Sequence, residues 1–187
     1  VIENEPLIVS VGRLERYKGH QNVIAAFAKV IQHIPNARLR IAGTGPYEAA
    51  LRQMVQDLGL SNSVEIGAVP PSDRRGMSAL LTSASLVVLL SEYEAHPVAV
   101  MEALSLRRPV LVTDTSGLRE LAERGLVRSI PLNSTAADVA SAILKQLEDP
   151  LIPSGIDLPT WEACAADLLT VYRTVDRMRS SASQVAG

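Results

Sequence analysis

The chain has 187 residues, a formal net charge of −2 and 20% charged residues, which suits a domain of ordinary size with its own apolar core. This charge excludes a large basic field for nucleic acid or anionic lipid, and an aromatic content of only 3% argues against base-stacking surfaces. The single Cys164 cannot form an intramolecular disulfide and no apolar run is long enough to cross a bilayer, so we expect a cytoplasmic protein, with peripheral membrane attachment of the full-length protein as the alternative.

Short segments rich in branched residues alternate with segments of helical periodicity. The strands are expected at 7–11, 37–41, 64–66, 86–90, 110–113 and 126–130. The helices are expected at 21–34, 47–58, 73–84, 97–105, 118–124 and 136–148. The alternation predicts an α/β fold, a Rossmann-like doubly wound parallel sheet of about six strands with helices on both faces. Ligands of such sheets bind beyond the carboxyl ends of the strands, so the loops there are the places to look for a site.

The last part of the sequence has a different composition. Residues 149–159 contain three prolines and a glycine, which indicates a linker. Thr160 can cap a long C-terminal helix, 160–179, whose apolar stripe must pack on this domain or on a missing N-terminal domain. Residues 180–187 are expected to form a disordered tail. The first residues look like a cut inside a longer chain, so we expect a fragment.

The loop after the first strand, Val11–Gly19, carries two basic residues between glycines. Arg13 offers a guanidinium fork and Lys18 a flexible ammonium, a pair suited to a diphosphate where no metal neutralises it. The alternative is that both are solvated surface charges. The position after a strand's carboxyl end favours phosphate binding.

The loop after the second strand, Gly43-Thr-Gly-Pro46, has two of the three glycines of a dinucleotide fingerprint. Glu48 occupies the third position, where a side chain prevents close packing and sets an anion near a pyrophosphate. A tight turn with Pro46 at the first helical position explains the same residues without a ligand. An NAD-dependent domain is therefore only the second interpretation.

The stretch Ser91–Leu104 contains two glutamates. Pro97 suits the first position of a helix, which would leave the next three amides unpaired as an anion site. Apolar residues surround Glu102, so we expect a buried carboxylate that needs hydrogen-bond donors. Arg13 or a ligand with adjacent hydroxyls could supply them, and helix geometry does not separate these readings. Glu94, in the preceding loop, would face a different part of such a ligand.

Other chemistries find little support. The histidines His20, His33 and His96 are scattered, which argues against a zinc site, and no Asp-x-Asp pair is present to hold a divalent cation. After the fifth strand, Thr115 or Ser116 can cap the next helix. We therefore expect no metal and no cofactor.

Together these loops resemble the C-terminal, donor-binding half of the group 1 retaining glycosyltransferases of GT-B fold. The resemblance covers residues 7–178. The motifs that carry it, in the family's order, are Val11-Gly-Arg-Leu-x-x-x-Lys-Gly19, Gly43-x-Gly-Pro46, Val64-x-x-Gly-x-Val69 and Ser91-x-x-Glu-x7-Glu-Ala103. The spacing of Glu94 and Glu102 is the most specific of these features.

The resemblance implies that residues 1–148 bind a nucleotide-sugar, a UDP- or GDP-hexose. It implies that Arg13 and Lys18 hold the diphosphate and balance the charge on it as it leaves. It further implies that Glu102 accepts hydrogen bonds from the ribose and that Glu94, catalytic with the two cations, contacts the transferred sugar. The implied donor-binding residues are Gly12, Arg13, Lys18, Ala68, Val69, Glu94, His96, Val98, Ala99 and Glu102.

Some positions depart from the family pattern. Ala95-His96-Pro97 stands where Gly-Phe-Gly is frequent, Arg107 stands at a usual glycine, and Ser116-Gly117 replaces Gly-Gly. The acceptor, whether a sugar, a lipid-linked or a small molecule, would bind through the missing N-terminal domain, so the fragment alone should transfer no sugar. Besides the NAD-dependent domain, the remaining alternative is a non-catalytic interaction module in which Arg13, Lys18 and Glu102 form an ion-pair network.

Overall fold

The computed structural model describes residues 5–156 and 160–185, without the side chains of 179–185. The chain divides into two compact units, Val1–Ile156 and Asp157–Gly187. The first unit contains the sheet, and the second contains the C-terminal helix.

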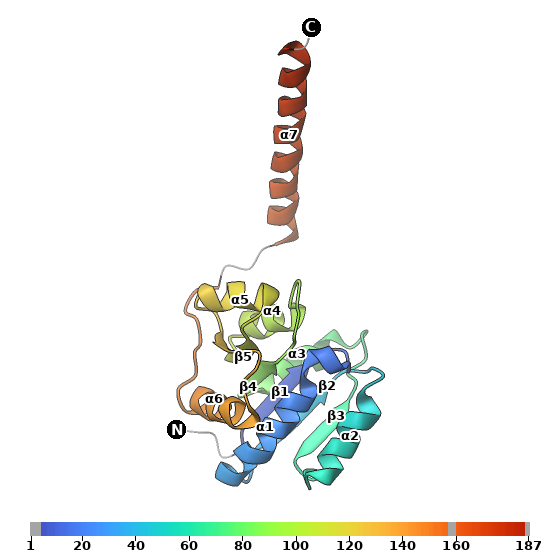
Figure 1. The fold of residues 1–187 in the computed structure, drawn as a ribbon, viewed down its shortest axis with the longest axis vertical. Helices are drawn as coiled ribbons and strands as arrows, with labels where there is room; N and C mark the ends of the chain where they lie inside the picture. Colours follow the sequence, from blue (N-terminus) through green and yellow to red (C-terminus); the bar gives the residue numbers. More distant parts are fainter. Residues whose placement is uncertain (1–4, 157–159, 186–187) are drawn as a thin grey trace. The chain divides into compact units, whose positions relative to one another are not determined.

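One parallel sheet of six strands organises the first unit (Figure 1), in the order β3-β2-β1-β4-β5-β6. The strands are β1 Leu7–Val11, β2 Arg38–Ala42, β3 Val64–Gly67, β4 Leu86–Leu89, β5 Val110–Thr113 and β6 Arg128–Ile130. The expected Rossmann-like, doubly wound sheet is confirmed. The strand order reverses between β1 and β4, so the topological switch point lies where the loops after these two strands meet.

Helices cover both faces of the sheet. They are η1 Arg16–Lys18, α1 His20–His33, α2 Glu48–Asp57, α3 Arg74–Ser83, α4 Val98–Ser105, α5 Ser116–Glu123 and α6 Ala136–Glu148. Buried side chains of α1, α2 and α6 belong to one apolar cluster, and those of α3, α4 and α5 to another. The expected positions of the six α-helices are confirmed, with ends that differ by at most two residues.

The strands divide their side chains between the two clusters. Ile8 and Val88 belong to the cluster with α1, whereas Val9, Val87 and Leu89 belong to the cluster with α4. Successive side chains of a strand point to opposite faces, so an unbroken apolar run is what a sheet covered on both sides requires. Each such side chain contributes about 1.5–3 kcal/mol when fully buried. The rigid sheet therefore fixes where its loops begin.

The C-terminal unit contains α7, Trp161–Val185. Thr160 caps it, since its Oγ1 accepts a hydrogen bond from the amide of Ala163 at 3.1 Å, as expected. The helix continues into the segment expected to be disordered, of which residues 186 and 187 lie outside the described residues, as do 157–159 of the expected linker. Within 5–156 and 160–185, no helix is long and apolar enough to span a bilayer. The partner of the apolar stripe of α7 stays a prediction.

Candidate functional site

Lys18, from the loop after β1, and Glu94, from the loop after β4, meet at the switch point. The Nζ atom of Lys18 lies 2.7 Å from Oε1 of Glu94, and the hydroxyl of Ser91 donates to the same oxygen at 2.7 Å. Their side chains are only 16% and 11% exposed. Salt screens a pair so shielded from water only weakly. Removing one partner would leave the other charge shielded from water without its counter-charge, which is destabilising. The sequence placed both residues in the site but did not predict that they pair with each other.

The loop of Glu94 is held from both sides. The amide of Glu92 donates to the carbonyl of Tyr17 at 2.8 Å, which ties it to the loop after β1. The amide of Glu94 donates to the hydroxyl of Ser116 at 2.8 Å, and the amide of Gly117 donates to the carbonyl of Glu94 at 2.9 Å. Ser116 adopts a φ of 40°, a left-handed conformation costly for a side chain, and its hydroxyl provides the acceptor that a glycine would lack. These contacts leave Glu94 little freedom.

Glycines allow the loops after β1 and β2 to touch. A Cβ atom on Gly43 would lie 1.9 Å from the carbonyl oxygen of Gly12, and one on Gly45 would lie 2.4 Å from that of Leu14. Backbone atoms of the loop after β1 lie directly beside both glycines, which supports the tight-turn interpretation. The sequence placed Pro46 at the first position of the helix. This was wrong, because Pro46 lies two residues before α2.

His20 forms a buried hydrogen-bonded link under the loop after β1. Its Nε2 lies 3.2 Å from the carbonyl oxygen of Arg13, and its Nδ1 lies 3.0 Å from the hydroxyl of Ser10. Burial, assisted by the nearby charge of Lys18, lowers the pKa of His20 to about 4, so the ring is neutral at pH 7. A carbonyl only accepts, so Nε2 carries the hydrogen and Nδ1 accepts from Ser10.

Sequence reasoning considered His20 only as a zinc ligand and therefore missed this role. The available signal was its position, directly after Gly19 at the first residue of α1 and next to the carboxyl end of β1. The residue fixes the carbonyl of Arg13 and so the course of the loop that carries Lys18.

Replacing His20 by glutamine should flatten the acid dependence of stability. The folded-state pKa lies below the unfolded value of 6.5, so the unfolded chain binds the extra proton and stability falls as pH drops from 6.5 towards 4. From pH 7 to pH 5 the wild type should lose about 2 kcal/mol more than His20→Gln. Urea unfolding at both pH values measures this. His33→Gln removes an exposed histidine and should keep the wild-type slope; equal slopes in the three proteins would contradict the prediction.

Arg13 is not part of the buried pair. Its side chain is 72% exposed and its guanidinium lies 2.5 Å from the carboxylate of Glu15. Of the two cations expected to lie together, only Lys18 is held at the switch point, and the guanidinium of Arg13 does not join it. Exposed pairs of this kind are worth about 0–1 kcal/mol, so Arg13 can leave Glu15 at small cost.

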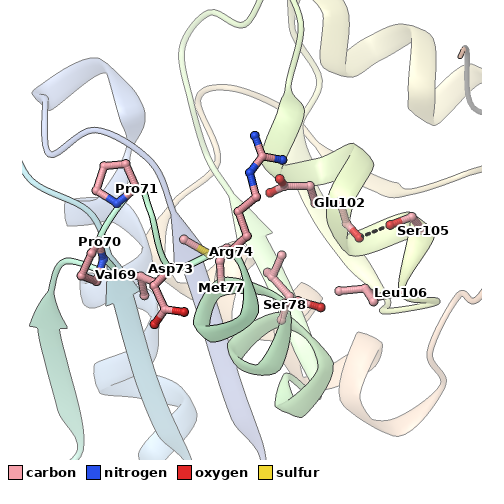
Figure 2. A pocket seen from close by; sticks show the side chains of 11 residues that line it. Val69, Pro70, Pro71, Asp73, Arg74, Met77, Ser78, Glu102, Ser105 and Leu106 are labelled. Atoms are coloured by element: carbon pink, nitrogen blue, oxygen red, sulfur yellow. Dashed lines mark hydrogen bonds between the residues drawn. The ribbon is translucent and has the colours of Figure 1, made fainter. Parts of the chain in front are cut away.

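Glu102 lines a cavity of about 410 Å³ between α3 and α4 (Figure 2). The expectation that it is buried is wrong: Glu102 is exposed, whereas Glu94 is the buried carboxylate at 9% exposure. The reason is that α4 buries Val100, Ala103 and Leu104 against the sheet and turns Glu102 to the open side. Figure 2 shows Arg74 of α3 pointing towards the Glu102 carboxylate. The lining residues are Val69, Pro70, Pro71, Asp73, Arg74, Met77, Ser78, Leu81, Glu102, Ser105 and Leu106.

The start of α4 differs from the expected anion site. Pro97 is the residue before the helix rather than its first residue. The amide of Val98 donates to the carbonyl of His96 at 2.9 Å, and that of Val100 donates to Pro97 at 3.0 Å. The prediction of three free amides is therefore wrong for two of them. Ala99 alone of the three has no backbone acceptor among the described residues.

The remaining predicted site residues lie at the carboxyl edge of the sheet. Gly12 follows β1, and its amide donates to the carbonyl of Ala42 at 3.1 Å. Ala68 follows β3 and is exposed, and Val69 next to it lines the Glu102 cavity. His96 is exposed in the loop after β4. These positions share an edge of the sheet, as expected for loops that follow parallel strands.

Comparison with known proteins decides the family. The sequence profile described as "Glycosyl transferases group 1" matches residues 1–157. The chain belongs to the group 1 glycosyltransferases. Among curated members, it is 27% identical over 149 residues to the alpha-D-kanosaminyltransferase of Streptomyces kanamyceticus, covering 80% of this chain and 38% of that protein. It is 35% identical over 122 residues to the putative colanic acid biosynthesis glycosyltransferase WcaL of Escherichia coli, covering 62% and 30%. The chain thus spans about a third of the curated relatives it matches.

Solved glycosyltransferases share the fold. Sucrose-phosphate synthase from Thermosynechococcus elongatus superposes with a TM-score of 0.74 at 25% identity, covering 93% of this chain and 46% of that one. HepE from Anabaena, solved with UDP and glucose, gives 0.70 at 23% identity, covering 95% and 49%. TarM from S. aureus, solved with UDP among other ligands, gives 0.69 at 21%, covering 80% and 30%. This group 1 chain therefore has the Rossmann-like fold of GT-B glycosyltransferases.

Proposed function

We propose that this chain is the donor-binding half of a retaining glycosyltransferase. The enzyme would transfer a hexosyl group from a UDP- or GDP-hexose to an acceptor held by another domain, in the cytoplasm or at a membrane surface. The observation that carries the proposal is the buried Lys18–Glu94 pair at the switch point of the sheet, 2.7 Å between Nζ and Oε1. A cation fixed there meets an anion that enters from the carboxyl edge.

Lys18 would bind the diphosphate and stabilise the charge that grows on it as the sugar leaves. A preorganised ammonium can do this without a metal, since it needs no rearrangement during the reaction. Glu94, held by Ser91, keeps Lys18 in place and retains a second carboxylate oxygen for a hydroxyl of the transferred sugar. Arg13 would move from its exposed pair with Glu15 onto the diphosphate, where a guanidinium binds two oxygens at once.

The Glu102 cavity would take the nucleoside. The exposed carboxylate of Glu102 can accept hydrogen bonds from both ribose hydroxyls. Because water solvates this carboxylate in the free protein, its charge does not destabilise the fold. Val69 and Ala68 would contact the base by backbone and apolar surface. His96, Val98 and Ala99 would then lie towards the phosphates, with the Ala99 amide as the donor that the free structure leaves available.

Titration of the chain with UDP, GDP and NAD, followed through amide resonances, tests this function. We expect shifts at Gly12, Val98 and Glu102 with UDP or GDP that persist in EDTA, and no sugar transfer by the chain alone. Shifts with NAD only would favour the dinucleotide interpretation. No shift with any of the three would favour an interaction module, and turnover by the chain itself would contradict the division between two domains.

Replacing Glu102 by alanine should weaken UDP binding about tenfold, the equivalent of about 1.4 kcal/mol for lost hydrogen bonds to a charged acceptor. Because Glu102 is exposed, the free energy of unfolding should change by no more than about 0.5 kcal/mol. Calorimetric titration and urea unfolding measure the two quantities. Glu120→Ala removes an exposed glutamate of α5 outside the cavity and should bind like the wild type. An unchanged affinity in Glu102→Ala would remove the ribose assignment.

A further inference from the structure

A second cavity, of about 500 Å³, opens at the carboxyl edge of the sheet beside the buried pair. Three loops form its walls, those after β1, β2 and β4. It shares no lining residue with the Glu102 cavity, and neither Lys18 nor Glu94 lines it. The lining residues are Glu15, Arg16, Tyr17, Pro46, Tyr47 and Glu92.

The walls of this cavity are fixed before any ligand arrives. The amide of Tyr47 donates to the carbonyl of Leu14 at 2.9 Å, and the amide of Glu92 donates to that of Tyr17 at 2.8 Å. Tyr47 packs against the apolar cluster of α1 and α2. The Nζ atom of Lys18 lies 5.1 Å from the centre of the Tyr17 ring, within the range of a cation–π contact. A ligand would therefore meet rings that are already ordered, which lowers the entropy lost on binding.

The composition of this cavity is unusual for this chain. Only four tyrosines, one phenylalanine and one tryptophan occur in the whole sequence, and two of the tyrosines line this one cavity. Charged groups stand beside the rings, because Glu15, Arg16 and Glu92 also line the cavity. Aromatic rings next to charged donors and acceptors suit a ligand with alternating C–H and hydroxyl surfaces.

We propose that this cavity is a carbohydrate-binding site, in which the rings of Tyr17 and Tyr47 contact the C–H face of a sugar and Glu92 and Arg16 bind its hydroxyls. Aromatic faces provide contact area at low entropy cost, and a carboxylate and a guanidinium match hydroxyls that both donate and accept. The volume is that of a small-molecule site and holds a mono- or disaccharide.

The site lies next to the proposed donor site because Glu15, Arg16 and Tyr17 fall between Arg13 and Lys18 in one loop. A sugar bound there would be adjacent to the diphosphate, so this cavity would add contacts to an acceptor that another domain mainly holds. Saccharide binding itself requires no nucleotide site; only the reading of the cavity as an acceptor subsite rests on the proposed function.

Amide spectra of the chain test the proposal directly. The probes are the methyl glycosides of glucose, mannose, galactose and N-acetylglucosamine, and maltose, at millimolar concentrations, with glycerol as a polyol control. At least one saccharide should shift the resonances of Tyr17, Tyr47 and Glu92, and glycerol should not. No shift with any saccharide, or equal shifts with glycerol, would overturn the proposal.

Variants locate the binding. Tyr47→Leu keeps an apolar side chain on the core but removes the ring, and it should weaken binding of the responding saccharide about tenfold. Glu92→Gln should weaken it about threefold or more. Glu92 is exposed, so this variant remains informative where Tyr47→Leu fails to fold. Tyr93→Leu, at a 61% exposed tyrosine outside the cavity, should bind like the wild type. Equal weakening by Tyr93→Leu would overturn the assignment.

The donor site and the carbohydrate-binding site can be tested independently of each other. Glu102→Ala should lower the affinity for UDP and leave the saccharide shifts unchanged, because Glu102 lines only the other cavity. Loss of UDP binding with intact saccharide shifts would overturn the donor assignment alone. Loss of the saccharide shifts in Glu102→Ala would show that the sugar binds elsewhere and would overturn the second site.

Discussion

Replacing Lys18 by alanine is expected to weaken UDP binding by about 10- to 100-fold. A hydrogen bond to a charged group is worth about 1.5–3 kcal/mol, and every 1.4 kcal/mol is a factor of ten in the dissociation constant. Lys18 supplies such a bond from a side chain that is only 16% exposed, where solvent screening is weak. Calorimetric titration at one salt concentration measures the effect. Lys29→Ala removes an exposed lysine of α1 and should bind UDP like the wild type.

The same change should also destabilise the chain, which a double variant separates from the loss of contact with the ligand. Lys18→Ala leaves the Glu94 carboxylate shielded from water with only Ser91 as donor, a costly state. Adding Glu94→Gln removes this uncompensated negative charge. The double variant Lys18→Ala/Glu94→Gln should therefore unfold at a higher urea concentration than Lys18→Ala alone. UDP binding should stay weak in both. Recovery of the affinity in the double variant would show that Lys18 acts only as a partner of Glu94.

The fold was predictable because its signals are local and repeated. Unbroken apolar strands such as 86–90 indicate a sheet covered on both faces, and helices between them require parallel strands. From that, the loops after β1 and β4 follow as the place for a site, since parallel strands end at a common edge. Thr160 as a cap was equally predictable, because it depends on a few neighbouring residues.

The details of the site were less predictable because they depend on which way a short element faces. The apolar residues around Glu102 suggested that this side chain is buried. The helix α4 has only eight residues and buries one side against the sheet, and Glu102 lies on the opposite, exposed side. The burial of Glu94 comes from contacts between residues distant in sequence, such as Lys18 with Glu94, whereas the role of His20 depends on Ser10 and Arg13, which are close to it in sequence. No periodicity encodes such pairs. The pairing of Arg13 with Glu15 is a rotamer choice at the surface and leaves no pattern at all.

Replacing Gly19 by alanine should affect the chain far more than replacing Gly59. Both glycines have left-handed backbones, with φ of 74° and 67°, so an alanine suffers comparable strain at each, about 1–2 kcal/mol. Their surroundings differ: a Cβ atom on Gly19 would lie 1.9 Å from the carbonyl oxygen of Leu90, whereas one on Gly59 would meet no atom within 4 Å. Gly59→Ala is therefore the matched control for backbone strain.

The clash at Gly19 has a functional consequence because of where it occurs. Leu90 lies between the end of β4 and Ser91, and Gly19 immediately follows Lys18. Relieving the overlap must separate the two loops and lengthen the 2.7 Å contact between Lys18 and Glu94. Gly19→Ala should thus lose several kcal/mol beyond Gly59→Ala in urea unfolding and lose UDP binding, which Gly59→Ala keeps. Equal stability and affinity in the two variants would mean that the close approach of these loops does not hold the pair together.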